Sequence, residues 1–126
     1  MKQLNIKKTA QKAVVLAEIF EGKDKIDTDE IIKTHPNGIH INNIEFITMQ
    51  GDKGEEQFWA YTFDENPNVF AFSGFVLAKI FNNLLEDCEG DYEELYESFK
   101  ACGGLSVRLY SDRTKKGQPI TKVDVL

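Results

Sequence analysis

The stretch IHINNIEFITMQGDKGEEQFWAYTF, residues 39–63, decides the fold of this chain. Its first part, Ile39 to Gln50, and its last part, Gln57 to Phe63, are rich in β-branched and aromatic residues, which favour strands. The four residues Gly51-Asp52-Lys53-Gly54 between them are typical of a hairpin loop. The alternation of apolar residues changes parity at Asn42-Asn43, and this shift predicts a bulge that bends one long strand within a curved sheet.

The residues after this hairpin predict one further strand and then two helices. Turn-forming residues 65–68 precede a short strand from Val69 to Phe72. Apolar residues then recur with helical spacing over residues 76–85. Asp91 stands at the position of an N-cap for a second helix, and Glu94 follows three residues later in the capping-box relation.

Two more strands are expected at the C-terminal end, and a helix is expected at the N-terminal end. Gly103-Gly104 ends the second helix, and the runs Leu105 to Ser111 and Pro119 to Val125 follow as strands. Residues 9–21 show apolar side chains at helical spacing, with Gly22 as a stop, and Thr28 to Lys33 predicts a short helical turn.

The predicted order is therefore helix, three strands, two helices and two strands. This order matches the five-stranded Greek-key barrel of the OB-fold. In that fold a helical connection lies between the third and fourth strands, where this chain has its helical pair. We therefore expect an α+β, mainly β chain that forms one OB-like domain over residues 1–126, with an N-terminal helical extension over about residues 9–34.

The formal net charge of −6 hides a segregation of charge along the chain. Residues 86–104 carry seven acidic residues against Lys100 alone. Residues 105–126 carry five basic residues against Asp112 and Asp124, a local net charge of +3. The C-terminal segment is therefore expected to offer a basic surface on an acidic body.

Composition also bears on where the protein works. No apolar run approaches the ~20 residues that a membrane-spanning helix requires, and no signal-peptide pattern is present. Cys88 and Cys102 are too few for a disulfide framework and lack the spacing of a zinc site, so we expect both to be reduced. The sequence thus predicts a soluble, cytoplasmic protein that does not contact a membrane.

The sequence offers little for catalysis. It contains no Gly-rich phosphate loop, no nucleophile elbow and no metalloprotease helix. His35 and His40 lie in or beside a turn without further ligand residues, so we interpret them as exposed loop and strand residues rather than as metal ligands. The acidic residues Asp91, Glu93 and Glu94 are more simply a charge bias at a helix N-terminus than a general acid and base. We expect a non-enzymatic protein with no metal and no cofactor.

The strand at residues 57–63 is a candidate for base stacking. Alternation places Trp59, Tyr61 and Phe63 on one face, and Phe58, Ala60 and Thr62 on the other. If the face with the smaller residues points inward, three aromatic rings face outward as a platform for nucleic-acid bases. The alternative is that these three rings fill the interior of the barrel.

The last two strands and their turn provide the second half of the candidate site. With Leu105, Val107 and Leu109 inward, the neighbouring Arg108 and Tyr110 point outward as a phosphate contact and a stacking ring. The turn and the returning strand bring further positive charge to the same region, where OB-folds often bind oligonucleotides. These further cations are Arg113, Lys115, Lys116 and Lys122.

Short motifs are spread over nearly the whole chain. They are TDEIIKTHPNG at 28–38, YTFDENP at 61–67, FAFSG at 70–74, GGLSV at 103–107 and TKKG at 114–117. In these motifs the chain resembles small proteins of bacteriophages and prophages of Gram-positive bacteria that are described as single-stranded-DNA-binding. The resemblance implies an OB-fold and a role in phage DNA replication or recombination in the cytoplasm of the bacterial host. Bacterial single-stranded-DNA-binding proteins generally end in an acidic tail that recruits partners, whereas this chain ends in an expected strand.

Two functions from different classes remain open, besides a purely structural or assembly role. The first is sequence-tolerant binding of single-stranded DNA by stacking and phosphate neutralisation, without hydrolysis and with replication or recombination proteins as possible partners. The second is an acidic protein-interaction module or nucleic-acid mimic, whose helical segment 86–97 docks a basic partner. Exposed edge strands or aromatic residues could equally form a homodimer.

Overall fold

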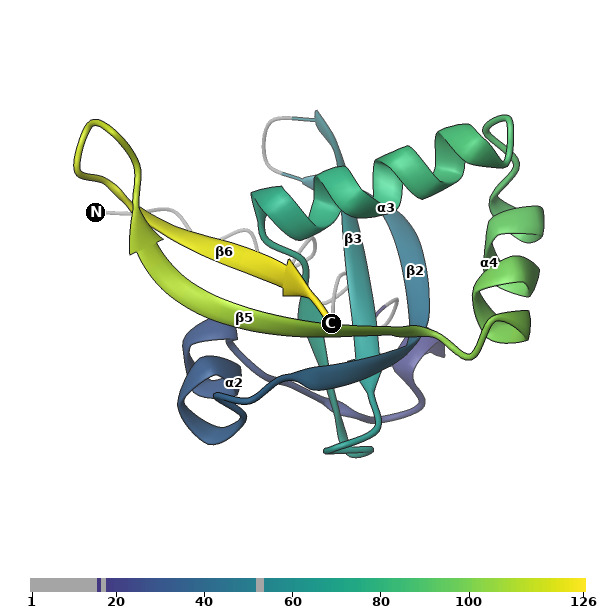
Figure 1. Cartoon of the computed structure of the whole chain (residues 1–126). Helices are drawn as coiled ribbons and strands as arrows, with labels where there is room; N and C mark the ends of the chain where they lie inside the picture. Colours follow the sequence, from purple (N-terminus) through teal and green to yellow (C-terminus); the bar gives the residue numbers. More distant parts are fainter. Residues whose placement is uncertain (1–15, 17, 52–53) are drawn as a thin grey trace, which may run out of the picture.

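The long antiparallel hairpin formed by β2 (Ile39–Gly51) and β3 (Gly54–Phe63) organises the molecule, as the sequence predicts. The structure is a computed structural model that describes residues 16, 18–51 and 54–126. The register of the two strands shifts between Ile41 and Asn43, which confirms the predicted bulge. Residues Ile39 to Ile41 of β2 pair with β5, while Ile41 and the residues from Asn43 onward pair with β3, so this one bent strand belongs to two parts of the sheet (Figure 1).

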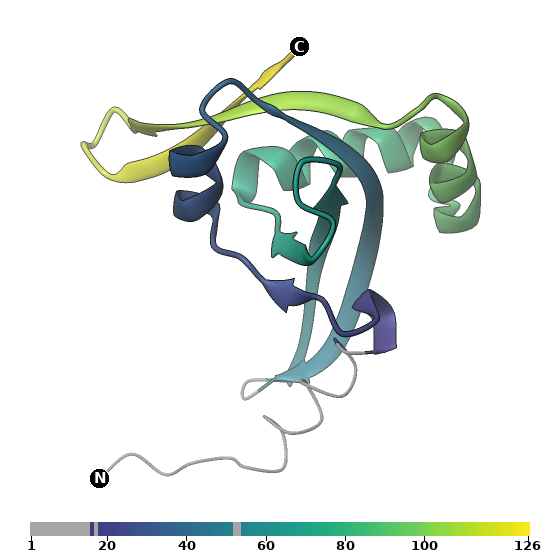
Figure 2. The same ribbon diagram turned by 90° about the horizontal axis from the view of Figure 1, so that it is seen from below.

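The sheet has six strands in the order β1-β4-β3-β2-β5-β6 and curls into a half-barrel (Figure 1, Figure 2). The predicted number of five strands is wrong, because a two-residue strand, β1, pairs in parallel with β4. Two charged residues carry no alternation of apolar side chains, so the sequence pattern does not mark this strand. This unpredicted strand β1 is Asp24–Lys25. The other strands confirm the predicted positions: β4 is Val69–Phe72, β5 is Leu105–Arg113 and β6 is Pro119–Val125.

The helices α2 (Thr28–Thr34), α3 (Phe75–Asp87) and α4 (Tyr92–Ala101) lie where the sequence predicts helical segments. Asp91 caps α4, because its Oδ1 accepts a hydrogen bond from the backbone N–H of Glu94 at 3.2 Å. Helix α3 crosses the inside of the curled sheet and packs against β3 and β6, while α4 packs against β2. None of the helices in the described part of the chain is long and apolar enough to cross a membrane.

The main core fills the inside of the half-barrel. It joins apolar side chains of the curled sheet to those of all three helices, and it has almost no contact with solvent. The central residues are Ile31, Ile41, Ile44, Trp59, Tyr61, Phe63, Leu77, Phe81, Leu95, Phe99 and Val107.

A second, smaller core lies on the opposite face of β2, β3 and β4. Phe20 covers this face and stacks on Phe70 of β4, with ring centroids 4.1 Å apart and planes within 2° of parallel. Of the helix predicted over residues 9–21, Leu16 and residues 18–20 are described and helical, and Glu21 lies in the turn that follows. The other residues of this range lie outside the described part of the chain. The central part of the sheet is therefore buried on both faces.

Candidate nucleic-acid interface

The three aromatic residues of β3 are part of the core. The expectation that Trp59, Tyr61 and Phe63 face outward is wrong, since their exposed fractions are 2%, 1% and 0%. The reason is the cover that Phe20 provides on the opposite face, where Ala60 leaves room for it. From Trp59 to Phe63 both faces of β3 are buried, and the three larger rings fill the wider interior.

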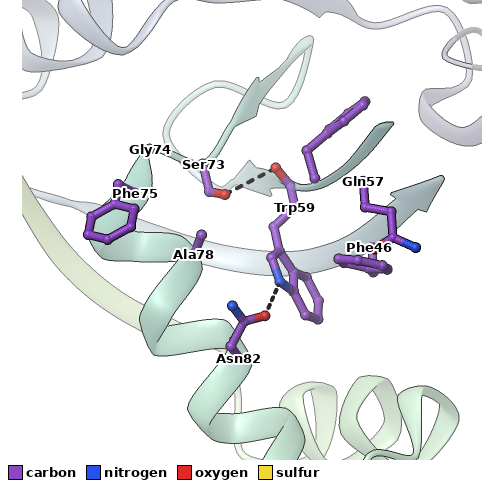
Figure 3. A pocket seen from close by; sticks show the side chains of 9 residues that line it. Phe46, Gln57, Trp59, Ser73, Gly74, Phe75, Ala78 and Asn82 are labelled. Atoms are coloured by element: carbon purple, nitrogen blue, oxygen red, sulfur yellow. Dashed lines mark hydrogen bonds between the residues drawn. The ribbon is translucent and has the colours of Figure 1, made fainter. Parts of the chain in front are cut away.

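The surroundings of these rings confirm a structural role. The Trp59 indole Nε1 donates a hydrogen bond to Asn82 Oδ1 of α3 at 2.8 Å (Figure 3). Burial raises the pKa of the Tyr61 hydroxyl far above its ordinary value, because the interior disfavours the phenolate. With these rings enclosed, nucleic-acid bases cannot stack on them while this packing persists.

Arg108 and Tyr110 lie on the outer face of β5, as the alternation of that strand predicts. Val107 and Leu109 point into the main core, whereas Arg108 and Tyr110 are half-exposed. The central guanidinium carbon of Arg108 lies 4.6 Å from the centroid of the Tyr110 ring. Such a cation–π contact holds an aromatic ring beside a positive charge on an accessible surface.

The returning strand β6 adds both cations and carboxylates to this face. In the β5–β6 register, Lys122 is opposite Tyr110, and Asp124 is opposite Arg108. Arg108 Nη2 lies 2.6 Å from Asp124 Oδ2, and Lys122 Nζ lies 2.9 Å from Asp112 Oδ2. The hydrogen bond between Lys122 and Asp112 lowers the pKa of the carboxyl and raises the pKa of the amine. Two of the predicted phosphate contacts thus already have carboxylate partners.

The turn between β5 and β6 carries the other predicted cations. The Gly117 N–H donates to the Thr114 carbonyl at 2.8 Å, and the φ of +80° at Gly117 closes the turn in a conformation that favours glycine. Arg113 Nη1 donates to the Gly117 carbonyl at 2.9 Å, while Lys115 and Lys116 are exposed at the tip. In the described part of the chain, none of these three cations forms an ion pair. The turn projects from one end of the molecule and presents three positive charges there (Figure 1).

The two histidines are half-buried rather than exposed. His40 Nδ1 lies 2.7 Å from Ser106 Oγ, and Nε2 is hydrogen-bonded to the Gly103 carbonyl. A Cβ atom at Gly104 would collide with backbone of β2, so only glycine fits at this crossing. The His35 ring packs edge-on against the core residue Phe63, with the two ring centroids 5.7 Å apart. The two hydrogen bonds of the His40 ring thus hold the start of β5 against β2.

Phe75 is an exposed aromatic residue that the sequence pattern does not single out. It is 69% exposed at the start of α3, and Lys79 Nζ lies 4.9 Å from its ring centroid. Phe75 lines an open pocket of about 440 Å³ that also contacts Trp59 (Figure 3). The sequence does hold a signal for this exposure: Phe75 precedes the apolar stripe over residues 76–85, and a side chain outside that stripe faces solvent.

The acidic residues at the end of α3, in the connection that follows it and on α4 form a negatively charged region. All seven are exposed, and none makes an ion pair within the described residues. The α4 end of the molecule and the β5–β6 turn lie at opposite ends (Figure 1). The segregation of charge along the sequence is therefore also a segregation in space. The seven residues are Glu86, Asp87, Glu89, Asp91, Glu93, Glu94 and Glu97.

Comparisons of the chain with protein-family models, with curated proteins and with solved structures find no match. The functional argument therefore depends on the geometry of the outer β5–β6 face and its turn, together with the sequence motifs.

Proposed function

We propose that this protein binds single-stranded DNA, without catalysing a reaction on it, through the outer face and the turn of the β5–β6 hairpin. The observation that carries the proposal is the half-exposed Tyr110 ring held against Arg108, with Lys122 opposite it on β6. Arg113, Lys115 and Lys116 continue the same positive surface at the turn. One aromatic ring and several cations thus share one strand pair of an otherwise acidic protein.

The chemistry of this face suits single-stranded nucleic acid of any sequence. Every base has a π-face, and each base stacked on an aromatic ring contributes ~1–3 kcal/mol. Lys and Arg side chains neutralise phosphates and release the counterions that surround them. Tyr110 is the stacking residue in this proposal, Arg113 and Lys115 and Lys116 are the main phosphate contacts, and Arg108 and Lys122 contribute when their carboxylates are displaced.

An OB-like interpretation of the fold supports the proposal. The chain forms β2, β3 and β4, then the helices, and then β5, which returns beside β2 and is followed by β6. This succession is compatible with an OB-like fold. The additional β1 and the open half-barrel are departures from the five-stranded barrel. OB-folds bind oligonucleotides on the face of their second and third strands and on two loops, one of which corresponds to the β5–β6 turn. Since Phe20 covers the first of these surfaces here, the turn and its hairpin are the part left open.

The biological setting of the proposal comes from the resemblance of the short motifs to phage and prophage single-stranded-DNA-binding proteins. We therefore place the proposed binding in phage DNA replication or recombination, where single strands are exposed. Replication or recombination proteins are the expected protein partners.

A second candidate function is an acidic interaction module that docks a basic partner on the α3–α4 segment. The observation in its favour is that all seven acids of this segment are exposed and lack ion pairs within the described residues. In that case, charge reversal at Glu93 and Glu94 abolishes the activity, while changes at Lys115 and Lys116 leave it intact. The DNA-binding proposal predicts the opposite pattern.

The test of the proposed function is a titration of fluorescently labelled oligo-dT with the full chain, followed by anisotropy. Tyr110→Ala is expected to weaken binding by about 1–3 kcal/mol, the contribution of one stacked base. The double variant Lys115→Gln/Lys116→Gln is expected to weaken it further, because two phosphate contacts are lost. Lys100→Gln removes one positive charge from α4 and serves as the matched control. Equal affinities for all four proteins, or no binding by the wild type, would contradict the proposal.

A further inference from the structure

The outer edge of β3 loses its neighbouring strand halfway along its length. The Ser73 backbone N–H donates to the Trp59 carbonyl at 2.9 Å, and its hydroxyl reaches the same oxygen at 3.2 Å. The chain then leaves the sheet, since Gly74 is the N-cap of α3. From Trp59 back toward the hairpin loop, β3 therefore has no described strand on the side opposite β2.

Hydrogen-bond parity shows which backbone groups point to this open edge. Phe46 is opposite Trp59 in the β2–β3 register, but its N–H donates to the Tyr96 hydroxyl at 2.9 Å and not to β3. This pair is therefore one of the antiparallel pairs that exchange no backbone hydrogen bonds, and such pairs recur at every second residue. Gln57 and Glu55 lie two and four residues before Trp59, so they also belong to pairs without backbone hydrogen bonds to β2. Their N–H and C=O groups therefore point away from β2. No hydrogen bond joins them to a described backbone group.

An open pocket lies beside this edge, where β4 turns into α3. Its volume is about 440 Å³, and Gln57, Trp59, Phe75 and Ala78 are among the residues that line it (Figure 3). Phe75 is 69% exposed, so its ring is accessible to a ligand at the rim of this pocket. A strand added at the edge would place alternate side chains on this side of the sheet, where the pocket can take one apolar side chain.

The charges at the edge favour one kind of occupant. Glu55 and Glu56 are exposed, lie on opposite faces of β3, and form no ion pair within the described residues. They attract Lys and Arg side chains and repel phosphates. A second copy of the chain paired edge to edge would bring the same carboxylates together, which is unfavourable. A basic peptide satisfies both the backbone groups and the charges.

We infer that the β3 edge at Glu55–Gln57 is a docking site for an extended, basic peptide segment of a partner protein, which adds a strand to the sheet and inserts an apolar side chain beside Phe75. Such strand addition obtains its affinity from main-chain hydrogen bonds and its specificity from the pockets for alternate side chains. The site is separate from the β5–β6 hairpin. The protein can thus hold a protein partner without giving up the proposed DNA-binding face.

The test uses a labelled peptide of about seven residues, an ordinary strand length, with alternating Lys and Val and one central Phe. Gln57→Pro removes the N–H that points to the open edge, while Phe58 and Glu56 keep the ladder to β2, and proline is tolerated where an edge N–H faces solvent. Gln57→Ala keeps the N–H and is the matched control. The wild type and Gln57→Ala are expected to bind with similar affinity. Gln57→Pro is expected to bind at least about tenfold more weakly, because a hydrogen bond is lost and the ring blocks the approaching strand.

Two further variants keep the test independent of the folding of Gln57→Pro. Phe75→Ala opens the pocket at an exposed position and is expected to lower the affinity for the peptide severalfold. Glu55→Lys/Glu56→Lys reverses the charge at the edge and is expected to abolish binding of the Lys-containing peptide. Unchanged affinity in both variants would overturn the inference.

The remaining outcomes identify a different occupant and also overturn the inference. If the protein is a dimer that Gln57→Pro converts to monomers, the edge pairs with a second copy. If Gln57→Pro no longer binds oligo-dT but still binds the peptide, nucleic acid occupies the edge. Conversely, loss of peptide binding with intact oligo-dT binding supports the inference, and this result is distinguishable from any failure of the DNA-binding proposal.

Discussion

The ion pairs on the outer face of the hairpin predict how the proposed DNA binding depends on salt. Arg108 and Lys122 are held by carboxylates at 2.6 and 2.9 Å, whereas Arg113, Lys115 and Lys116 form no ion pair within the described residues. Only cations that neutralise phosphates contribute to the salt dependence, at about 0.7 in the slope of log K against log[salt] per phosphate for a single strand. The three cations without carboxylate partners therefore predict a slope of about −2 for the wild type.

Replacing both carboxylates in Asp112→Asn/Asp124→Asn frees Arg108 and Lys122 for two more phosphates. The slope is then expected to steepen to about −3.5, and binding at low salt is expected to tighten. Exposed ion pairs contribute little to folding, so this variant is expected to remain folded. The assay is anisotropy of labelled oligo-dT between about 0.05 and 0.3 M salt, with unfolding curves as the control for structure. A slope that stays the same or becomes shallower in the double variant would refute the assignment of these cations.

Further predictions test the packing on which the site depends. Phe20→Ala is expected to destabilise the protein by about 3–5 kcal/mol in urea unfolding, because the ring stacks on Phe70 and closes the second core; a loss below about 1 kcal/mol would contradict this role. Gly104→Ala is expected to lower the melting temperature more than Gly117→Ala, since both residues have positive φ but only a Cβ at Gly104 meets backbone; equal losses would mean that the crossing with β2 is not tight. The contribution of Tyr61 to stability is expected to be constant below about pH 10 and to fall as the pH rises further, because the unfolded chain ionises Tyr61 while the folded core keeps it protonated. Tyr61→Phe should flatten this alkaline fall, and an unchanged profile above about pH 10 would argue against burial of the hydroxyl.

The elements that sequence reasoning predicts correctly are those set by local patterns. The hairpin of β2 and β3, its bulge at Asn42 and the Asp91 cap each depend on residues within a few positions of one another. The outward direction of Arg108 and Tyr110 likewise follows from the two-residue period of one strand whose inner residues are plainly apolar. These features can therefore be predicted from the sequence alone.

The features that sequence reasoning misses depend on distant partners. The direction of Trp59 is decided by Phe20, which is far from β3 in the sequence and covers the opposite face of the sheet. When both faces of a strand are buried, alternation alone cannot tell which of them faces the larger core. The pairing of Lys122 with Asp112 is likewise a consequence of strand register. Composition therefore overestimates how much of the positive charge of the hairpin is available to a ligand.

The measurement that tests the central claim most directly is the location of bound DNA on the protein. Backbone amide chemical shifts of the full chain would be followed during titration with oligo-dT. The account predicts the largest changes in β5, β6 and their turn, centred on Tyr110 and Lys115, with little change in α4. Changes concentrated in the acidic segment 86–97, or no change at any residue, would contradict DNA binding by the β5–β6 hairpin.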